Sequence, residues 1–557
     1  MAKKTVSKTA RTRKPKSDSQ IVFTPPVRSE KNPSSATVGT HVSIRAGAGT
    51  GKTTTMELGY LNLQGKPLPF KPSDEQEAII DSFRGTSPND QIKFVCFNKS
   101  IANEFIHRGL PGCTNHSLGF AAVRKIRPRI RLDEGGYNVR DFFEQTAKID
   151  AKRNFDLLRL TEKTVSLAKM TLCGWSPGAD MTELNGSDET WVRDFMSMID
   201  RYGLELGEHL DRVCGLTADI LAYDARFNAR ISFDDMVWLP VVRDLGLTQY
   251  DHLIVDERQD LNRCQQLLLQ KSCLSGRITA VGDKFQSIYG FAGADAEAFE
   301  NMDSWMSSQP RGMSAFPLMK TRRCPKSVVE LARTLVPEYE SLPEAPEGRI
   351  VRSVPWAAML GELLPTDPLS EFVCRPGDMI LCRVNAPLVQ FVYRLLRKGI
   401  RANIQGRDIG KGIVSLVRKA NASTIEDLIR RCEEARDKEL SKARASKYVS
   451  ENRIQAIEDK YDCLSTFCEE AESVEQLIAN VERIFQDVKD RSTIVLLSSV
   501  HRAKGLEAER VTILCPEKMP LTFKKMLPWQ KQQENNIQYV AWTRTKNVLA
   551  FAETPSS

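Results

Sequence analysis

Short apolar runs alternate with helix-forming stretches along most of this chain. A short strand predicted at residues 41–45 runs into glycines, and an apolar strand at residues 92–97 runs into a polar turn. A helix-forming stretch follows in both cases. Further apolar runs lie at residues 253–255 and 278–281. Buried parallel strands typically appear as short apolar runs, because helices cover both faces of their sheet. We therefore predict an α/β domain with a parallel sheet in the first part of the chain.

The same alternation starts again beyond residue 320. Strands are predicted at residues 378–383 and 400–404, with a helix at residues 388–397 between them. The remaining predicted strands cover residues 493–498, 511–515 and 548–550. A second α/β domain is therefore expected in the C-terminal part.

Two mostly helical segments interrupt these domains. Residues 127–230 have helical patterning broken by glycines and Pro177. Residues 411–490 are highly charged, and their apolar side chains recur at helical spacing, which predicts antiparallel helices with solvated charged faces. These apolar positions are Ile425, Leu428, Ile429 and Cys432, and then Ile454, Ile457, Tyr461 and Leu464.

We accordingly divide the chain into an N-terminal arm and two interrupted α/β domains. The first domain is predicted over residues 37–126 and 231–319, with residues 127–230 as its helical insertion. The second is predicted over residues 320–410 and 491–557, with residues 411–490 as a shorter helical insertion. The arm covers residues 1–36.

Composition excludes several other classes of protein. No stretch approaches the roughly 18 uninterrupted apolar residues that a membrane span requires, and no apolar signal-peptide core is visible near the N-terminus. The 13 cysteines are scattered without CxxC pairs, so we expect neither a zinc site nor a disulfide framework. Reduced thiols are typical of a cytoplasmic or nuclear location.

The net charge of +8 resides mainly in the arm. Residues 1–20 contain seven basic residues and one acidic residue, which accounts for six of the eight charges. We expect this segment to be disordered, because its lysines, serines and prolines cannot form a core. Three roles stay open for it: binding phosphates, acting as an address, or keeping the protein soluble.

A glycine-rich loop follows the first predicted strand and carries the strongest chemical signal. Such a loop lets backbone N–H groups surround a polyphosphate, and the following helix adds its partial positive charge. Lys52 would bind the β- and γ-phosphates, and the Thr53 hydroxyl would ligate Mg²⁺. The alternative is an ordinary glycine-rich turn before a helix. The loop residues are Ala46, Gly47, Ala48, Gly49, Thr50, Gly51, Lys52, Thr53 and Thr54, with Ala46 where the usual pattern has glycine.

A pair of carboxylates, Asp256 and Glu257, ends the predicted strand at residues 253–255. Ligands of open α/β sheets bind at the carboxyl edge of the strands, where both side chains would lie. Asp256 is placed to hold Mg²⁺, and Glu257 to orient and deprotonate the attacking water. An acidic strand end on an ordinary surface is the alternative.

Several further segments complete a recognisable series. Residues 256–260 (DERQD) and 281–291 (VGDKFQSIYGF) resemble two boxes of the UvrD/Rep/PcrA group of superfamily 1 helicases. Other matching boxes are FNKS at 97–100, TNHS at 114–117, FDD at 233–235, TRRCP at 321–325, HRAKGLE at 501–507 and YVAWTRTK at 539–546. Together with the phosphate loop they occur in family order over residues 41–551, which chance alone rarely produces. The chain is therefore identified as resembling this family. Its insertion at residues 411–490 is short for the family and resembles that of smaller relatives, which include phage and plasmid enzymes and the F-box helicase branch.

This resemblance implies two RecA-like domains with ATP bound between them. Arg323 and Arg544, from the second domain, would reach the γ-phosphate and neutralise charge on the transferred group. Gln286 would sense the γ-phosphate, Arg322 would occupy the base-stacking position, and Glu507 would bind the ribose. The implied catalytic set is Lys52, Glu257, Gln286, Arg323 and Arg544.

The resemblance also implies that single-stranded DNA lies across both domains. Aromatic side chains that stack on bases, with hydroxyls and cations on phosphates, suit sequence-independent binding. The candidates are Phe97, Asn98, Lys99, His116, Tyr289, Phe291, His501 and Arg502. The alternative for Phe97 and Phe291 is core packing, and for Lys99 simple exposure to solvent.

Three departures from the family pattern affect nucleotide and DNA contacts. The glutamine box that usually precedes the phosphate loop is missing, and a similar segment around Gln76 follows the loop instead. Gln76 either contacts adenine from this rearranged position or lies on an ordinary amphipathic helix. Arg322 replaces the usual aromatic residue, and Ala292 replaces an arginine that the family uses on DNA.

From the sequence we expect a Mg²⁺-dependent ATPase that moves on single-stranded DNA, 3′ to 5′ by family resemblance, and unwinds duplex junctions in repair, recombination or replication. One alternative is a translocase that displaces recombinase filaments with little unwinding. Another is a non-catalytic binding module with a relic ATP site. We expect a monomer without membrane association, working with recombination or replication proteins in a bacterial nucleoid, a phage-infected host or a nucleus.

Overall fold

The computed structural model describes most of the chain beyond its N-terminal arm. The described residues are 39–87, 89–133, 137–204, 206–227, 230–290, 293–445, 451–486, 488, 490–523 and 526–553. Residues 37–557 form one compact unit. The arm predicted over residues 1–36 lies outside the described residues, as does Phe291.

The first α/β half is built on a fully parallel sheet of six strands in the order β3-β2-β6-β7-β1-β8. Its central strands are almost completely buried, which explains why they appear as apolar runs in the sequence. The strands are β1 (His41–Ala46), β2 (Ile92–Cys96), β3 (Gly112–Thr114), β6 (His252–Val255), β7 (Arg277–Gly282) and β8 (Met313–Leu318).

Helices alternate with these strands along the chain. They are α1 (Lys52–Leu63), α2 (Asp74–Ser82), α3 (Lys99–His107), α4 (Asn115–Ile126), α9 (Phe233–Val242), α10 (Arg263–Lys271) and α11 (Ala298–Ser308). Because β6, β7 and β1 are neighbours, residues that follow these three strands lie side by side at one sheet edge.

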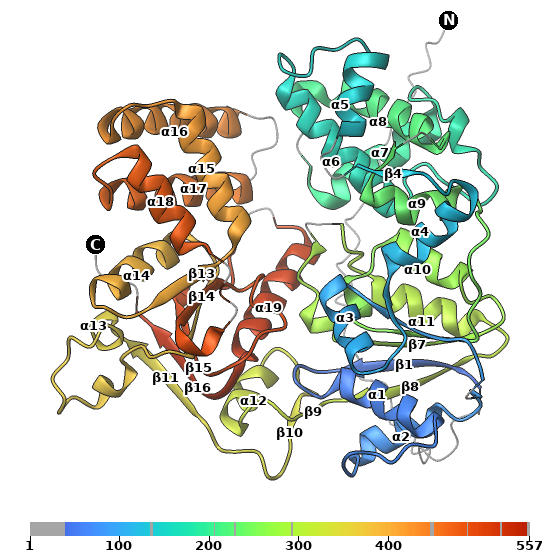
Figure 1. The fold of residues 1–557 in the computed structure, drawn as a ribbon, viewed down its shortest axis with the longest axis horizontal. Helices are drawn as coiled ribbons and strands as arrows, with labels where there is room; N and C mark the ends of the chain where they lie inside the picture. The colour runs from blue at the N-terminus through green and yellow to red at the C-terminus, as the bar shows by residue number, and fades with distance from the viewer. Residues whose placement is uncertain are drawn as a thin grey trace, which may run out of the picture. The chain divides into compact units, whose positions relative to one another are not determined.

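The first helical segment lies between α4 and α9 (Figure 1). It contains α5 (Tyr137–Asp141), α6 (Phe155–Thr171), α7 (Glu189–Tyr202) and α8 (Leu210–Ala225). Two short strands, β4 (Arg131–Leu132) and β5 (Arg230–Ile231), pair at its base. One continuous apolar core joins Trp191 and Ile220 of this segment to Leu253 and Ile278 of the sheet. The segment therefore packs directly on the first half.

The second half has its own fully parallel six-stranded sheet, in the order β11-β16-β15-β12-β14-β13. Its strands are β11 (Arg349–Val354), β12 (Met379–Cys382), β13 (Ala402–Gln405), β14 (Val495–Ser499), β15 (Ala508–Leu514) and β16 (Thr545–Ala552). The main helices of this half are α12 (Lys326–Arg333), α14 (Ala386–Arg397) and α19 (Pro528–Trp542).

The second helical segment consists of α15 (Arg407–Ala420), α16 (Ile425–Ala445), α17 (Glu451–Glu469) and α18 (Val474–Ile484) (Figure 1). Its first helix begins at Arg407, slightly before the predicted boundary at residue 411. Its buried face includes Leu428 and Leu464, which continue the core of the second sheet through Val389 and Ile380. Two α/β halves, each with a parallel sheet and a helical insertion, confirm the predicted fold class.

A third apolar cluster joins the two halves. It includes Ala48 of the glycine-rich loop and Ile288 from the first half, and Tyr339, Ile513 and Tyr539 from beyond β8. The strand pair β9 (Lys320–Thr321) and β10 (Glu340–Ser341) lies in the connection between the halves. The two sheets therefore share packed residues beside the candidate site. No helix in the described part of the chain combines the length and apolarity needed to cross a membrane.

Candidate active site

The glycine-rich loop connects β1 to α1 in the conformation that its sequence requires. Gly49 and Gly51 have φ values of 67° and 83°, in the left-handed region that favours glycine. A Cβ at Gly49 would also lie 2.5 Å from Cβ of Arg323. The Thr50 hydroxyl donates to the Gly47 carbonyl at 3.1 Å and closes the turn. The loop thus has the backbone form expected of a phosphate cradle, and Ala46 occupies the last position of β1.

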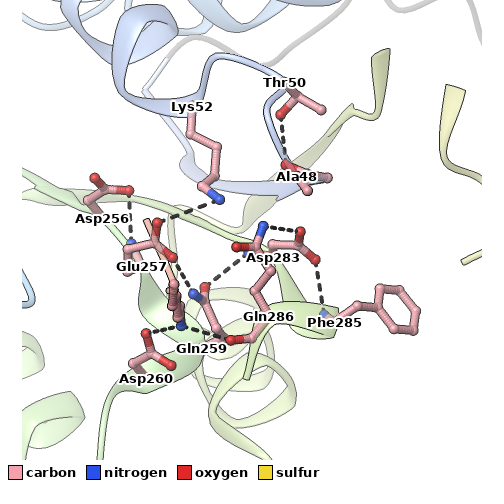
Figure 2. A network of polar contacts seen from close by, with 12 residues as sticks. Ala48, Thr50, Lys52, Asp256, Glu257, Gln259, Asp260, Asp283, Phe285 and Gln286 are labelled. Carbon is pink, nitrogen blue, oxygen red and sulfur yellow. Dashed lines mark hydrogen bonds and ion pairs between the residues drawn. The ribbon is translucent and has the colours of Figure 1, made fainter. Parts of the chain in front are cut away.

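Lys52 and Glu257 face each other at the carboxyl edge of the first sheet (Figure 2). Lys52 Nζ lies 3.6 Å from Glu257 Oε1. Burial opposes ionisation of Glu257, but the charges of Lys52 and Lys504 outweigh it and lower the pKa of this carboxyl. Glu257 is therefore ionised at neutral pH.

The pKa of the neighbouring Asp256 is shifted in the opposite direction, upward. Burial raises its pKa, and the neighbouring Glu257 raises it further, while Lys52 and a hydrogen bond with Thr53 act against this rise. The Asp256 carboxylate and the Thr53 hydroxyl are thus adjacent oxygen ligands, the type that Mg²⁺ prefers. A divalent cation at this position would offset the cost of burying the charged carboxylate, so the residues present fit the metal that the sequence predicts.

A buried amide network continues from these carboxylates toward the second half. The Gln259 amide donates to Glu257, and Gln259 Oε1 accepts from the backbone N–H of Asp283 at 3.0 Å. Asp283 in turn accepts from Gln286 Nε2 at 2.7 Å (Figure 2). A Cβ at Gly282 would lie 2.3 Å from Gln259 Oε1, so a side chain at this position would displace the Gln259 amide. The two sequence boxes therefore form one hydrogen-bonded unit.

Basic residues of the second half reach this unit. Arg544 is 1% exposed and its guanidinium donates to Gln286 Oε1 at 3.3 Å. Lys504 Nζ lies 2.5 Å from Asp260 Oδ2 and donates to the Gln286 carbonyl at 2.7 Å. Lys504 and Asp260 lie in boxes quoted from the sequence, but sequence reasoning did not assign them a role.

Arg323 and Glu507 also meet at this seam. Arg323 Nε donates to Glu507 Oε2 at 2.6 Å, and Lys546 Nζ pairs with the other oxygen of Glu507 at 2.6 Å. Burial raises the pKa of Glu507, but these two cations lower it by more. The predicted ribose ligand is therefore an ionised carboxylate held between two cations.

Two buried tyrosines hold the phosphate loop and were missed by sequence reasoning. The Tyr339 hydroxyl donates to the Ala48 carbonyl at 2.7 Å, and the Ala48 N–H donates to the Tyr539 hydroxyl at 3.0 Å. Tyr539 lies in the box at residues 539–546, so its position in that box was the available signal. Tyr339 lies in no box, and nothing in the sequence pattern distinguishes it.

Gln76 lies next to the same loop. It occupies the first turn of α2 and is 1% exposed. Gln76 Nε2 donates to Thr55 Oγ1 at 2.9 Å, while its Oε1 accepts from Arg322 Nη2 at 2.8 Å. Gln76 therefore lies on an amphipathic helix, which was one of the two alternatives. Its side chain faces the start of α1 and Arg322.

The aromatic candidates for nucleic-acid contact gather at a second place along the same edge. The ring of Phe97, which is 37% exposed, stacks parallel to Tyr289 with centroids 5.9 Å apart. The Tyr289 hydroxyl donates to the His501 carbonyl at 3.2 Å. Phe97 is thus at the surface, so core packing does not explain it.

A cavity of about 230 Å³ adjoins Phe97 and Tyr289, and His116, Asp234 and Lys169 also line it. His116 packs edge-on against Phe233, which is 51% exposed and was not among the predicted contacts. Such an opening beside stacked aromatic rings suits an unpaired base.

The other predicted contacts are more scattered. The Asn98 side chain caps α3 by accepting from the Ile101 N–H at 2.9 Å, and Lys99 is exposed. Burial and the charges of Arg383 and Arg502 lower the pKa of His501 to about 3, so its ring is neutral. Arg502 lies against the turn at Gly406, since a Cβ there would be 3.3 Å from Arg502 Nε.

Comparison with known proteins agrees with this geometry. Residues 89–306 match the family model of the UvrD/REP helicase N-terminal domain. Residues 89–306 therefore resemble the N-terminal domain of UvrD/REP helicases. This match confirms the family resemblance drawn from the sequence boxes. The matched residues include Asp256, Glu257 and Gln286 but begin after the phosphate loop.

Curated relatives match over different parts of the chain. F-box DNA helicase protein 1 of Schizosaccharomyces pombe is 27% identical over 526 residues, which is 88% of this chain and 55% of that protein. ATP-dependent DNA helicase Rep of Escherichia coli is 28% identical over 34% of this chain and 26% of its own length. ATP-dependent DNA helicase srs2 of S. pombe is 34% identical over 17% of this chain and 10% of its own length. The chain thus spans about half the length of the F-box helicase.

Among solved structures, the arterivirus nonstructural protein 10 helicase in complex with DNA matches with a TM-score of 0.29 and 9% identity. The match covers 92% of this chain and 61% of that one. A likeness at this score carries no conclusion about this chain.

Proposed function

We propose that this protein hydrolyses ATP and uses the energy to move along single-stranded DNA and separate duplex strands. One observation carries the proposal: Lys52 and Glu257 of the first sheet meet Gln286, Arg544 and Lys504 within one continuous polar network. Phosphoryl transfer at a site between two domains requires cations that stabilise negative charge on the transferred group. Here the second half places such cations at the catalytic edge of the first half.

Each residue has a role that follows from its chemistry. The γ-phosphate would compete with Glu257 for Lys52 and leave the ionised carboxylate to orient the attacking water. Arg544 and Arg323 would then stabilise negative charge that builds on the transferred group. Both arginines come from segments beyond β8, so binding and loss of the γ-phosphate would change the attraction between the halves.

Thr53 and Asp256 would hold Mg²⁺, which neutralises charge on the phosphate oxygens when it is bound. Side chains of the protein would position the γ-phosphate. Gln286 is one of them, and the buried carboxylate of Asp283 fixes the orientation of its amide.

The nucleotide site and the aromatic site are joined through Lys504. Its ammonium contacts Asp260 and the Gln286 carbonyl, and it also lies 5.0 Å from the centre of the Tyr289 ring. A shift of the second half on hydrolysis would therefore move Tyr289 relative to Phe97. This contact supports a direct mechanical link from phosphate to a stacked base.

The finer features of the proposal come from the family. We propose 3′-to-5′ movement, a monomer as the active form, and work at DNA junctions in repair, recombination or replication, in a bacterial nucleoid or a nucleus. Displacement of recombinase filaments with little unwinding is the alternative function, because the same ATP site would drive it.

The decisive test measures ATP hydrolysis with and without single-stranded DNA for the wild type and Lys52→Ala. Wild type should be stimulated by DNA, and Lys52→Ala should lose turnover while keeping its affinity for a labelled oligonucleotide. Lys66→Ala, at an exposed lysine after α1, is the matched control and should behave as wild type. Normal turnover by Lys52→Ala would refute the site.

A second assay separates the two proposed activities. Duplexes with a 3′ or a 5′ single-stranded tail report unwinding and its direction, and RNA tails test the choice of nucleic acid. Unwinding of the 3′-tailed DNA supports the helicase. Hydrolysis without strand separation, together with removal of a recombinase filament, would support the alternative.

A further inference from the structure

Three residues meet beside the phosphate loop in an arrangement that catalysis of phosphoryl transfer does not explain. The Arg322 N–H donates to the Gly49 carbonyl at 2.9 Å, which ties this residue directly to the loop. A Cβ at Gly51 would lie 3.8 Å from Arg322 Cδ and 3.6 Å from Gln76 Nε2. Arg322 and Gln76 are therefore neighbours of any nucleotide whose phosphates occupy the loop.

The third residue is Phe70, in the segment that joins α1 to α2. Its side chain is 42% exposed, and the guanidinium carbon of Arg322 lies over the ring at 6.0 Å from its centre. Two flat groups thus face each other at the surface. A base stacked between them needs about 3.5 Å on each side, or about 7 Å in all. Because Phe70 and Arg322 are both exposed, a movement of about 1 Å between the two side chains would admit the base.

Gln76 fixes this arrangement from behind. Its Oε1 accepts from the Ser73 N–H at 3.1 Å and from Arg322 Nη2 at 2.8 Å, which occupies both of its lone pairs. Its Nε2 donates to Thr55 Oγ1 at 2.9 Å. The amide is buried and its acceptor is used within the protein, so Gln76 orients Arg322 and is not free to accept a hydrogen bond from adenine.

We propose that Phe70 and Arg322 hold the base of the nucleotide between them, with Gln76 as a positioning residue, so that the site accepts adenine and guanine nucleoside triphosphates with little discrimination. This inference rests on the proposed function of the same site. Stacking tolerates any base because every base has a π-face. Strong discrimination would instead require a dedicated hydrogen bond to the base edge.

The test compares KM and kcat for ATP and GTP in the wild type, Phe70→Ala and Phe70→Tyr. Wild-type kcat/KM for the two nucleotides should agree within about tenfold, which corresponds to at most one ordinary hydrogen bond. Phe70→Ala should raise both KM values by about fivefold or more, since stacking on one aromatic ring is worth at least about 1 kcal/mol. Phe70→Tyr keeps the ring and should retain both KM values.

Two controls distinguish loss of stacking from damage to the loop. Tripolyphosphate, which has no base, should inhibit Phe70→Ala as strongly as the wild type. Phe155→Ala changes another exposed phenylalanine that lies under a cation, with Lys419 Nζ 5.5 Å from its ring centre, and should leave both KM values unchanged.

Gln76→Ala should raise both KM values and leave the ratio of ATP to GTP turnover unchanged, because it releases Arg322 without removing a base contact. A changed ratio would assign Gln76 to base recognition and overturn this part of the inference.

The whole inference fails if wild-type kcat/KM favours one purine by more than about tenfold, which would require a dedicated contact to the base edge. It also fails if Phe70→Ala leaves both KM values unchanged, or weakens tripolyphosphate binding equally. Failure of the proposed function would appear separately, as wild type that hydrolyses no nucleotide. In that event, displacement of a fluorescent ATP analogue by ATP, GTP and tripolyphosphate still tests the base contact.

Discussion

Lys169 ties three helices together, and replacing it with methionine should loosen them selectively. Its ammonium lies on α6, 2.6 Å from Asp224 Oδ2 on α8 and 2.7 Å from Asp235 Oδ1 on α9. All three side chains are at most 4% exposed. One cation thus compensates two buried carboxylates.

The magnitude follows from what Lys169→Met leaves behind. Removing one partner of a buried ion pair costs about 3–5 kcal/mol, because the remaining charge has been taken out of water. Here one substitution removes the partner of two carboxylates, so we expect a cost near the upper end, about 5 kcal/mol. Lys169→Met combined with Asp224→Asn should recover part of this loss, since one unpaired charge disappears with the second change.

The pH dependence gives the effect a distinctive signature. Burial and the nearby Asp235 already raise the pKa of Asp224 despite the attraction of Lys169, and loss of that lysine should raise it further. A carboxyl with a raised pKa in the folded state stabilises the protein at low pH and loses this contribution as pH rises through that pKa. The defect of Lys169→Met should therefore be largest near pH 8 and smaller near pH 6.

Amide hydrogen exchange measured by mass spectrometry suits this test, because it reports the opening of α6, α8 and α9 separately from the rest of the chain. Lys163→Met, at an exposed lysine of α6, is the matched control and should change protection by at most about 1 kcal/mol, because an exposed ion pair contributes no more than that. Unchanged protection in Lys169→Met, or a loss that is equal at both pH values, would refute the electrostatic argument.

Three other substitutions test separate parts of the structure. Arg544→Lys should lower kcat for ATP by about a thousandfold with a much smaller change in KM, and full turnover in steady-state assays would remove Arg544 from the γ-phosphate site. Gly119→Ala should cost about 3 kcal/mol in urea unfolding, because its Cβ would lie 2.0 Å from the Met236 carbonyl, whereas Gly215→Ala has open space and should be tolerated. Burial keeps the pKa of His252 well below its usual value, so only the unfolded chain takes up this proton. Between pH 7.5 and 5.5, protonation of His252 in the unfolded chain should lower the wild-type free energy of unfolding by about 1.4 kcal/mol. In urea unfolding at the two pH values, His252→Gln should show a smaller decrease, and equal decreases would contradict this account.

The central strands were predictable because burial on both faces leaves a clear mark in the sequence. The strands β6, β7, β12 and β14 are buried along their whole length and appear as apolar runs. Among the missed strands, β3, β8 and β11 lie at the edges of the two sheets. Of these, β8 and β11 have mixed polar and apolar residues. An edge strand has fewer neighbours, so its sequence is less constrained.

The local chemistry of the site was equally visible. Glycines at Gly49 and Gly51, the lysine that follows them, and a carboxylate pair after a buried strand are fixed by short-range requirements of backbone and ligand. These residues can be recognised as candidate site residues without knowing the order of strands in the sheet. The domain boundaries and the individual roles of the site residues stay predictions.

What the sequence alone determined is therefore local: which segments form buried strands, which turns can surround phosphate, and which family the ordered boxes resemble. Only the tertiary structure decided which distant residues meet. Tyr539 reaches Ala48 across 491 positions and Arg322 reaches Gln76 across 246. Such contacts depend on the order of strands within the sheets and on the packing of the two halves, and these follow from the summed burial of the whole chain and not from any single segment.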